Sequence, residues 1–291
     1  MTTIAVTGAT GHLGRLAVLA LLDRGVEPSS IVAAVRTPAS AQDLADRGVQ
    51  VREADYGRPE TLQAALAGVD RLLLVSGNEV GRRASGHRNV IDAAKTAGVS
   101  LVAYTSILNA GDTTMKLAGE HQETEEALRA SGVPFVLLRN GWYTENYTAA
   151  LAPTLEHGAL LGASTGEGRV APAARQDYAE AAAVVLTGEG HEGQAYELAG
   201  DRALTLPELA SVIADAAGQP VAYAPMAADE YAGVLAGAGV PAPMAEILAD
   251  SDLGIDRGEL VTDRDDLRRL IGRPTTPVEE TIAAALPAAA A

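Results

Sequence analysis

Short, predominantly apolar segments alternate with segments of helical hydrophobic spacing over the first two thirds of the chain. The apolar segments have the length of strands and lie at residues 4–6, 31–35, 49–51, 72–75, 101–104, 135–138 and 196–198. Most of them are apolar at every position, which is typical of strands buried on both faces of a parallel sheet. With right-handed crossovers, this alternation predicts an α/β fold with a doubly wound parallel sheet of the Rossmann type.

The segments between these strands carry apolar residues at the spacing of one helix face. Helices are expected at residues 13–21, 59–66, 88–97, 117–130, 177–186, 206–217 and 227–236. Residues 140–169 are expected to be loop-like with one short helix, and the prolines at 220, 225, 241 and 243 to break their segments. The alanine-rich residues 287–291 are expected to form a frayed tail.

The turn between the first strand and the first helix contains three glycines at the spacing G-x-x-G-x-x-G. Gly8 is suited to a tight turn, Gly11 to close approach of a phosphate, and Gly14 to close packing of helix on strand. The free N–H groups of the helix start and its dipole favour an anion there. The expected pyrophosphate-binding residues are Gly8, Thr10, Gly11, His12, Leu13 and Gly14. The alternative is a turn that only joins strand to helix.

Arg36 stands at the end of the second strand, where an NAD-binding fold usually carries an acidic residue for the ribose 2′-hydroxyl. A guanidinium at this place is suited to a forked contact with a 2′-phosphate. We therefore expect NADP rather than NAD as the cofactor. The alternative is a solvated arginine at a strand end.

The pattern loosens after Arg139, and this change predicts two parts of unequal size. Residues 1–141 are expected to form the NADP-binding Rossmann domain, completed by residues 171–200 or thereabouts. A smaller substrate-binding lobe is expected from residues 142–170 and 201–291. The length of 291 residues is sufficient for one such domain with an added lobe.

Several small or polar residues follow the carboxyl ends of the other strands. Asp55 and Tyr56 end the third strand, where the adenine should lie, although Asp55 is equally suited to capping the local turn. Ser76 and Gly77 follow the fourth strand and leave room for a ribose, or form a plain turn. Asn140 follows the sixth strand and is suited to bonding the nicotinamide amide or anchoring the turn.

Tyr104 and Ser106 lie at the end of the fifth strand, beside the expected nicotinamide position. Short-chain dehydrogenases place a serine there and a Tyr-x-x-x-Lys pair on the next helix, whose tyrosine donates a proton. Here Leu117 and His121 occupy those two positions. Tyr104, Ser106 and His121 are the candidate catalytic residues, with a structural histidine as the alternative for His121. A site without a strong acid suits acceptors that delocalise charge, such as quinones or cationic dyes.

Residues 139–147, with the sequence Arg-Asn-Gly-Trp-Tyr-Thr-Glu-Asn-Tyr, carry the resemblance to a known family. Other matching stretches lie at residues 7–14, 54–57, 72–76, 79–81, 87–91, 120–121, 196–200, 248–252 and 270–272. Together they closely resemble the bacterial NADPH:quinone oxidoreductases of type 2, an NmrA-like group of atypical short-chain dehydrogenases. The resemblance implies two-electron reduction of quinones by NADPH without flavin. Triphenylmethane dye reductases are near relatives, so a dye-like acceptor is also implied.

The same block contains Trp142, Tyr143 and Tyr147 in a chain that has only 3% aromatic residues. Flat rings stack on planar acceptors, so these three side chains are the candidate substrate-binding residues. The alternative is that they pack one lobe against the other.

Composition excludes several other kinds of protein. The net charge of −16 repels nucleic acid and anionic membranes, so the expected partner is a small-molecule acceptor, bound by a monomer or homodimer. Without cysteine there is no disulfide or thiolate chemistry, and the five histidines lack ligand spacing, so no metal is expected. No apolar run reaches membrane-spanning length, and the first strand starts too early for a leader, which predicts a cytoplasmic protein.

Three functions follow from these residues. The first is hydride transfer from NADPH to a quinone or similar conjugated acceptor. The second is an NADP-binding redox sensor without turnover. The absence of a Tyr-x-x-x-Lys pair is compatible with this sensor as well as with the quinone reductase. The third is a carbonyl, imine or dye reductase, with His121 as the proton donor of the carbonyl and imine reactions.

Overall fold

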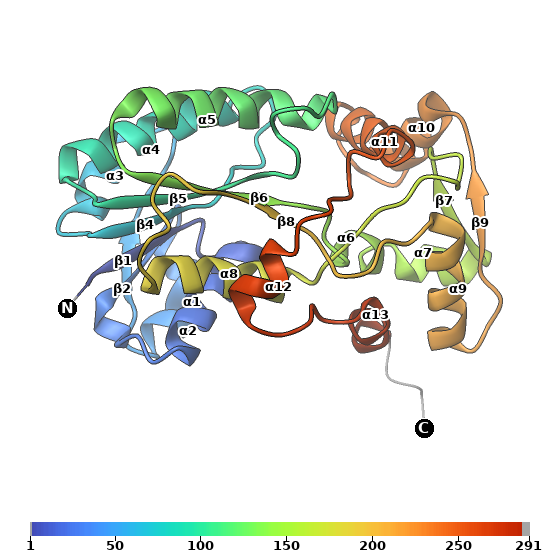
Figure 1. Cartoon of the computed structure of the whole chain (residues 1–291), viewed down its shortest axis with the longest axis horizontal. Coiled ribbons are helices and arrows are strands. Elements are labelled where there is room, and N and C mark those ends of the chain that lie inside the picture. Colours follow the sequence, from blue (N-terminus) through green and yellow to red (C-terminus); the bar gives the residue numbers. More distant parts are fainter. Residues whose placement is uncertain (1, 287–291) are drawn as a thin grey trace. The chain divides into compact units, whose positions relative to one another are not determined.

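The computed structural model describes residues 2–286, and the predicted tail at 287–291 lies outside them (Figure 1). The chain forms two compact units, each built from three stretches. The first unit comprises Met1–Ile107, Glu120–Asn140 and Arg175–Tyr196. The second comprises Leu108–Gly119, Gly141–Ala174 and Glu197–Ala291.

The first unit is built on a seven-stranded sheet with the order β3-β2-β1-β4-β5-β6-β8. Its strands are β1 (Ile4–Thr7), β2 (Ile31–Val35), β3 (Gln50–Glu53), β4 (Arg71–Leu74), β5 (Leu101–Ile107), β6 (Phe135–Asn140) and β8 (Ala195–Leu198). The five pairings from β3 to β6 are parallel. The predicted doubly wound α/β fold is confirmed, because the order reverses direction between β1 and β4.

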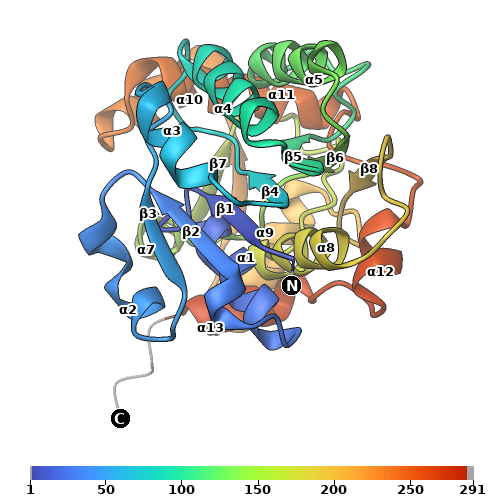
Figure 2. The same cartoon turned by 90° about the vertical axis from the view of Figure 1, so that its left-hand side faces the viewer.

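Helices cover both faces of this sheet, as Figures 1 and 2 show. The helices are α1 (His12–Asp23), α2 (Gln42–Ala45), α3 (Pro59–Leu66), α4 (Arg83–Ala97), α5 (Gly119–Ser131) and α8 (Arg175–Thr187). Helices α3, α4 and α5 lie on one face, while α1 and α8 lie on the other. Buried Leu66, Leu72 and Val90 belong to one apolar cluster between the first of these layers and the sheet. This two-sided burial explains why the strands are apolar at every position.

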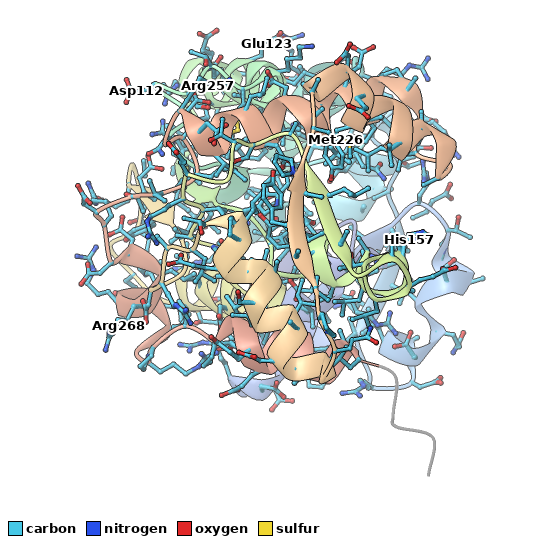
Figure 3. All side chains as sticks on the ribbon, turned by 90° about the vertical axis from the view of Figure 1, so that its right-hand side faces the viewer. Asp112, Glu123, His157, Met226, Arg257 and Arg268 are labelled. Carbon is cyan, nitrogen blue, oxygen red and sulfur yellow. The ribbon has the colours of Figure 1, made fainter. Side chains whose placement is uncertain are left out.

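The second unit contains a small parallel sheet and seven α-helices among its described residues. Its elements are α6 (Glu145–Thr148), α7 (Leu151–His157), β7 (Ala159–Gly162), α9 (Leu206–Ala217), β9 (Ala222–Pro225), α10 (Ala228–Gly237), α11 (Ala242–Asp256), α12 (Asp266–Ile271) and α13 (Val278–Ala285). Strands β7 and β9 pair with each other in parallel. Figure 3 shows exposed side chains at the ends of two of these helices: His157 is the last residue of α7, and Arg257 directly follows α11.

Helix α9 illustrates how the sequence sets element boundaries in this unit. The Thr205 hydroxyl accepts a hydrogen bond from the backbone N–H of Glu208 (3.2 Å), and the Glu208 carboxylate accepts one from the N–H of Thr205 (2.8 Å). This capping box fixes the start, and Gly218 ends the helix with φ +65°. The helix expected at residues 206–217 has these bounds.

Helix α11 and both strands of the small sheet were not expected. The prolines at 241 and 243 read as breaks in the sequence, but Pro241 is the N-cap of α11 and Pro243 lies in its first turn. Proline is tolerated at these positions because the first N–H groups of a helix have no partner within it. The prediction that these prolines interrupt the segment after them is therefore wrong.

The observed grouping also differs from the predicted domain boundaries at residues 108–119. Glu259 holds this stretch within the second unit, accepting hydrogen bonds from the hydroxyls of Thr113 (3.0 Å) and Thr114 (2.7 Å). The side-chain amide of Asn109 donates to the carbonyl oxygen of Glu259 (3.0 Å). These bonds join residues that are about half the chain apart, so no local sequence pattern reports them.

No helix among residues 2–286 is long and apolar enough to cross a membrane.

Candidate active site

The glycine turn of the first unit has the geometry of a phosphate-binding loop. Gly8 has φ +58°, in the left-handed region that favours glycine. A Cβ on Gly14 would stand 2.4 Å from the carbonyl oxygen of Gly8, so no side chain fits there. Gly11 is the N-cap of α1 and presents no side chain over the helix start.

The start of α1 is open to an anion. Thr10, Gly11 and His12 are exposed, whereas Leu13 is buried and faces the core. The first turn of α1 contains no acidic residue that would repel a phosphate. These residues fit a dinucleotide pyrophosphate, bound by backbone N–H groups rather than basic side chains.

Arg36 directly follows β2 and its side chain is 70% exposed. Its guanidinium pairs with Glu79 at 3.0 Å, and the glutamate is itself more than half exposed. An exposed pair of this kind contributes little stability. The arginine is therefore available to an incoming phosphate.

Asp55 and Tyr56 both make local contacts in the first unit. The Asp55 carboxylate accepts a hydrogen bond from the N–H of Gly57 (2.8 Å), which is the turn-capping role. The Tyr56 hydroxyl donates to the carbonyl oxygen of Val75 (2.7 Å) and lies 2.6 Å from the Thr7 hydroxyl. Tyr56 thus links the ends of β1, β3 and β4 below the expected adenine position.

The residues after β4 are held by side chains of neighbouring elements. The N–H of Ser76 donates to the hydroxyl of Thr105 (2.8 Å), and the N–H of Gly77 donates to Nε2 of His87 (2.9 Å). Because Nε2 accepts, the proton of the neutral His87 ring is on Nδ1, which lies 2.9 Å from the Thr124 hydroxyl. Burial and the charge of Arg83 lower the pKa of His87 to about 3, so this neutral ring persists.

Tyr104 and His121, two of the candidate catalytic residues, contact each other. The Tyr104 hydroxyl lies 2.7 Å from Nδ1 of His121, and both side chains are buried. Burial, with the nearby charge of Arg83, holds the pKa of His121 well below its ordinary value. Burial raises the pKa of Tyr104. Near neutral pH the pair is uncharged, so His121 is not an imidazolium acid.

Ser106 is held in a buried ionic cluster. Its hydroxyl donates to Glu125 (2.7 Å), which also accepts two hydrogen bonds from Arg139 (2.9 and 2.8 Å). Arg129 donates to the same carboxylate (2.8 Å). Burial alone would raise the pKa of Glu125, but the hydrogen bonds from Arg139 and Ser106 outweigh it and the pKa is lowered. Ser106 therefore positions β5 against α5 and β6.

The remaining candidates divide between the two units. Asn140 is buried at the end of β6 in the first unit. Trp142 and Tyr143 are half-buried in the second unit, where the carbonyl oxygen of Trp142 accepts a hydrogen bond from Ala173 (3.1 Å). Tyr147 lies on α6 of the same unit.

The Tyr147 hydroxyl is buried and makes no hydrogen bond within the described part of the chain. It lies in the electrostatic field of Asp252 on α11, whose carboxylate accepts a hydrogen bond from the N–H of Ala163 (2.8 Å). Tyr223 and Tyr231 interact with the same carboxylate. Burial raises the pKa of Asp252 to about 6.

Asp252→Asn is expected to stabilise the protein at pH 8 by about 2 kcal/mol, about 5 °C in melting temperature. The folded-state pKa lies above the ordinary value of 3.8, so the ionised carboxylate disfavours folding above pH 6. This penalty fades as the pH falls toward 4, and there the variant and wild type should melt together. Thermal unfolding between pH 4 and 8 measures the difference.

Asp256→Asn is the matched comparison, four residues further along α11. Hydrogen bonds from Ser164 and Thr165 outweigh burial and lower the pKa of Asp256. Its replacement should therefore destabilise the protein at pH 8. A gain in melting temperature for both variants would refute the assignment of the Asp252 pKa.

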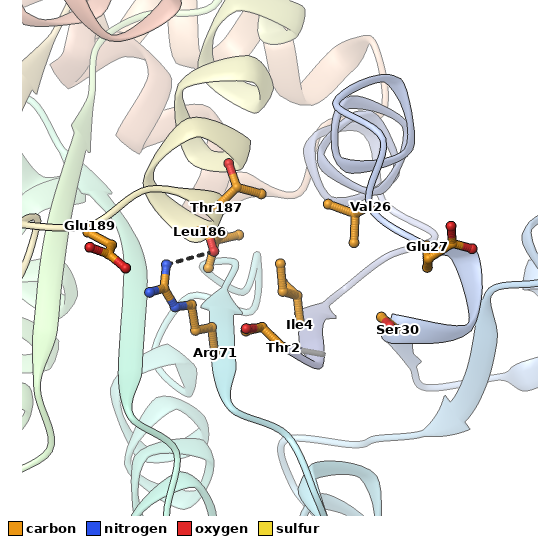
Figure 4. Close-up of a pocket in the computed structure, with 9 residues that line it drawn as sticks. All are labelled: Thr2, Ile4, Val26, Glu27, Ser30, Arg71, Leu186, Thr187 and Glu189. Carbon is orange, nitrogen blue, oxygen red and sulfur yellow. Dashed lines mark hydrogen bonds between the residues drawn. The ribbon is translucent and has the colours of Figure 1, made fainter.

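A pocket of about 320 Å³ lies at the amino-terminal ends of the strands of the large sheet, away from the glycine turn (Figure 4). It is lined by Thr2, Ile4, Val26, Glu27, Ser30, Arg71, Leu186, Thr187 and Glu189. Ile4 and Arg71 begin their strands, so the pocket is at the amino-terminal ends, whereas ligands of doubly wound sheets bind at the carboxyl ends. Arg71 donates to the carbonyl oxygen of Leu186 (3.0 Å) and stabilises the end of α8.

Three features of the site were not foreseen from the sequence: the buried guanidinium of Arg83, the Glu125 cluster and the Asp252 carboxylate. None follows from a local motif: Arg83 lies two residues beyond the matching stretch 79–81, and Asp252 is the last residue of the matching stretch 248–252. No cluster of three or more potential metal ligands occurs in residues 2–286.

The sheet order, the glycine turn and the helix behind it define an α/β protein of the dinucleotide-binding class. Residues 8–195 match the model of a protein family described as NAD(P)H-binding, and the chain belongs to this family. It is 50% identical over 279 residues to Quinone oxidoreductase 2 of Escherichia coli, covering 96% of this chain and 97% of that protein. The family resemblance seen in the sequence is thereby confirmed.

Solved structures agree with this assignment. The crystal structure of the NADPH-dependent quinone oxidoreductase of Escherichia coli in complex with NADPH matches with a TM-score of 0.93 at 50% identity, over 97% of this chain and 99% of that chain. The Citrobacter sp. triphenylmethane reductase complexed with NADP(H) matches with a TM-score of 0.92 at 41% identity, over 98% and 100% of the two chains. The predicted nicotinamide dinucleotide cofactor is confirmed at the level of the family.

Proposed function

We propose that this protein transfers a hydride from NADPH to a quinone or a similar conjugated acceptor, without flavin. The observation that carries the proposal is the 50% identity, over nearly the whole of both chains, to an NADPH-dependent quinone oxidoreductase. The open helix start and the exposed Arg36 support the same cofactor. The net charge of −16 supports a small-molecule acceptor rather than nucleic acid as the partner. A cytoplasmic location and a monomeric or dimeric state are part of the same proposal.

The chain's own residues position the reactants. Bound NADPH supplies the hydride. The backbone N–H groups that follow Gly11 in the first turn of α1 hold the pyrophosphate, with Asn140 and the residues after β4 beside the nicotinamide end. Tyr104 and His121 remain neutral and shape the site without donating a proton. Trp142, Tyr143 and Tyr147 offer rings and a hydroxyl to a planar acceptor.

The selection of NADPH over NADH is expected to depend on Arg36. Arg36→Glu should weaken NADPH binding about 100-fold, because two charge-assisted hydrogen bonds to the 2′-phosphate are replaced by repulsion. NADH binding should change little. Titration calorimetry with both nucleotides measures the effect, and unchanged NADPH affinity would remove Arg36 from the site.

Arg88→Glu is a suitable control for this variant. Arg88 is another exposed arginine in an ion pair, with Glu123 at 3.0 Å, and lies on α4. Its reversal changes the net charge equally, so the affinity for NADPH should stay within about twofold of the wild type if only long-range charge is altered.

The direct test of the function is NADPH oxidation in the presence of 1,4-benzoquinone and 1,4-naphthoquinone, followed at 340 nm with purified, flavin-free protein. Turnover well above the background is expected. Tight NADPH binding with no turnover on any quinone would instead favour the redox sensor.

A cationic triphenylmethane dye is the second candidate acceptor. The 41% identity to the Citrobacter reductase favours it, and hydride transfer to such a cation needs no proton. Decolourisation in the same assay would add this activity.

A further inference from the structure

Arg83, the first residue of α4, is a buried cation without a carboxylate partner. Its exposure is 6%, and its Nε donates to the carbonyl oxygen of Gly77 (2.6 Å). Its guanidinium makes no other hydrogen bond or ion pair with the residues that the structure describes. Buried charges are normally paired, so an anion from outside the described chain is the expected partner.

An acidic side chain of α5 that faces the start of α4 bonds to other groups. Glu120 of α5 accepts hydrogen bonds from the N–H groups of Gly81 (3.1 Å) and Ala84 (3.3 Å). It thereby caps the start of α4 instead of neutralising Arg83. The hydrogen bond to Gly77 orients the guanidinium, and the capped helix start fixes the backbone that carries it.

Arg83 acts on the residues of the reacting end of the site. Its charge lowers the pKa of both His87 and His121, and it also acts on Tyr104. These groups lie around the ends of β4 and β5, whereas the phosphate-binding turn and Arg36 follow β1 and β2. The position of Arg83 therefore favours the reacting atoms over the phosphates.

We propose that the guanidinium of Arg83 stabilises the negative charge that forms on the acceptor oxygen during hydride transfer. This inference rests on the proposed function. The hydride adds two electrons and one proton to the quinone, the electron pair of a C=O bond moves to oxygen, and the resulting oxyanion pairs with Arg83. A proton from water then completes the hydroquinone, while the dinucleotide leaves as NADP⁺.

This role accounts for the absence of a Tyr-x-x-x-Lys pair. A ketone reductase needs an acid that protonates the alkoxide, but a hydroquinone anion is far less basic and requires only a fixed positive charge. Removing one donor from a preorganised oxyanion site lowers kcat about 100- to 1000-fold in other enzymes. We therefore expect an effect of this order from loss of the Arg83 charge.

Arg83→Gln and Arg83→Lys separate charge from packing. The glutamine keeps an N–H donor for Gly77 but loses the charge, whereas the lysine keeps the charge. With saturating NADPH, Arg83→Gln should lower kcat for 1,4-naphthoquinone about 100-fold, and Arg83→Lys should retain part of the activity. Arg82→Gln, at the exposed neighbouring arginine, should leave kcat unchanged.

Binding of a charged product analogue tests the same role without turnover. 2-Hydroxy-1,4-naphthoquinone is an anion at neutral pH, and its 2-methoxy analogue is neutral. In the presence of NADP⁺, quenching of Trp142, the single tryptophan, should show anion binding weakened about tenfold or more in Arg83→Gln. Binding of the methoxy compound and of NADPH should change less than about twofold.

Two results would overturn the proposal. Equal affinity of Arg83→Gln and wild type for the anion would show that Arg83 does not face the acceptor oxygen. A large rise in the NADPH dissociation constant with kcat intact would make Arg83 a phosphate ligand instead. A wild-type protein that oxidises no NADPH with quinones would refute the proposed function, and anion binding would still test Arg83.

Discussion

Gly14→Ala is expected to abolish NADPH binding. The added methyl group would stand 2.4 Å from the carbonyl oxygen of Gly8 and 2.8 Å from its carbonyl carbon, both of them backbone atoms that cannot rotate away. The start of α1 must then move away from β1, and its N–H groups no longer point toward the pyrophosphate. Overpacking of this kind costs about 1–3 kcal/mol, so the protein should still fold.

Calorimetry with NADPH, together with circular dichroism, measures both parts of this result. Gly233→Ala is the matched control, because Gly233 is also helical and a Cβ there meets nothing within 4 Å. Alanine at this position should stabilise α10 slightly and leave NADPH binding as it is. Normal NADPH affinity in Gly14→Ala would mean that the cofactor does not use this turn.

Glu125→Gln is expected to destabilise the protein by about 4 kcal/mol, the largest stability effect foreseen among these variants. The Glu125 side chain is 3% exposed and its carboxylate balances Arg139, which is 15% exposed. The amide removes the negative charge that balances this guanidinium and turns an N–H₂ group toward the donors of Arg139, Arg129 and Ser106. Thermal unfolding near neutral pH should show a fall of about 10 °C.

Glu123→Gln controls for the loss of one charge on the same helix. Glu123 pairs with Arg88 at 3.0 Å, and both side chains are more than half exposed. Such a surface pair is worth about 1 kcal/mol or less, so the melting temperature should barely move. Equal losses for the two variants would contradict the structural role of the Glu125 cluster.

The large sheet was predictable because its strands are buried on both faces. Full burial requires apolar residues at every position, and β2 at Ile31–Val35 was therefore located to the residue. The strands of the small sheet are not buried at every position. Buried and half-buried residues alternate in β7 at Ala159–Gly162, and β9 at Ala222–Pro225 is partly exposed and ends in proline. Helix α11 was missed because its prolines were interpreted as helix breakers, whereas they lie at the start of the helix, where proline is tolerated.

The proposed cofactor-binding residues were recognisable in the sequence for a different reason. The strand, the glycine spacing and the arginine after the next strand stand within one βαβ unit, so their relation is local. Arg83 gave no such signal, because its burial depends on α4 starting there rather than at residue 88 and on Glu120 from another helix. Asp252 became notable only when its helix placed it beside three tyrosines that are distant in sequence.

The discontinuity of the second unit has a consequence for synthesis. Its stretch Leu108–Gly119 is anchored by Glu259, which a ribosome adds about 150 residues later. The first unit has all of its own residues once Tyr196 has emerged, whereas the second must wait for nearly the full polypeptide. Nascent chains and C-terminally truncated products therefore contain a complete first unit but expose apolar segments of an incomplete second unit. Such exposed segments are bound by chaperones and cleaved by proteases.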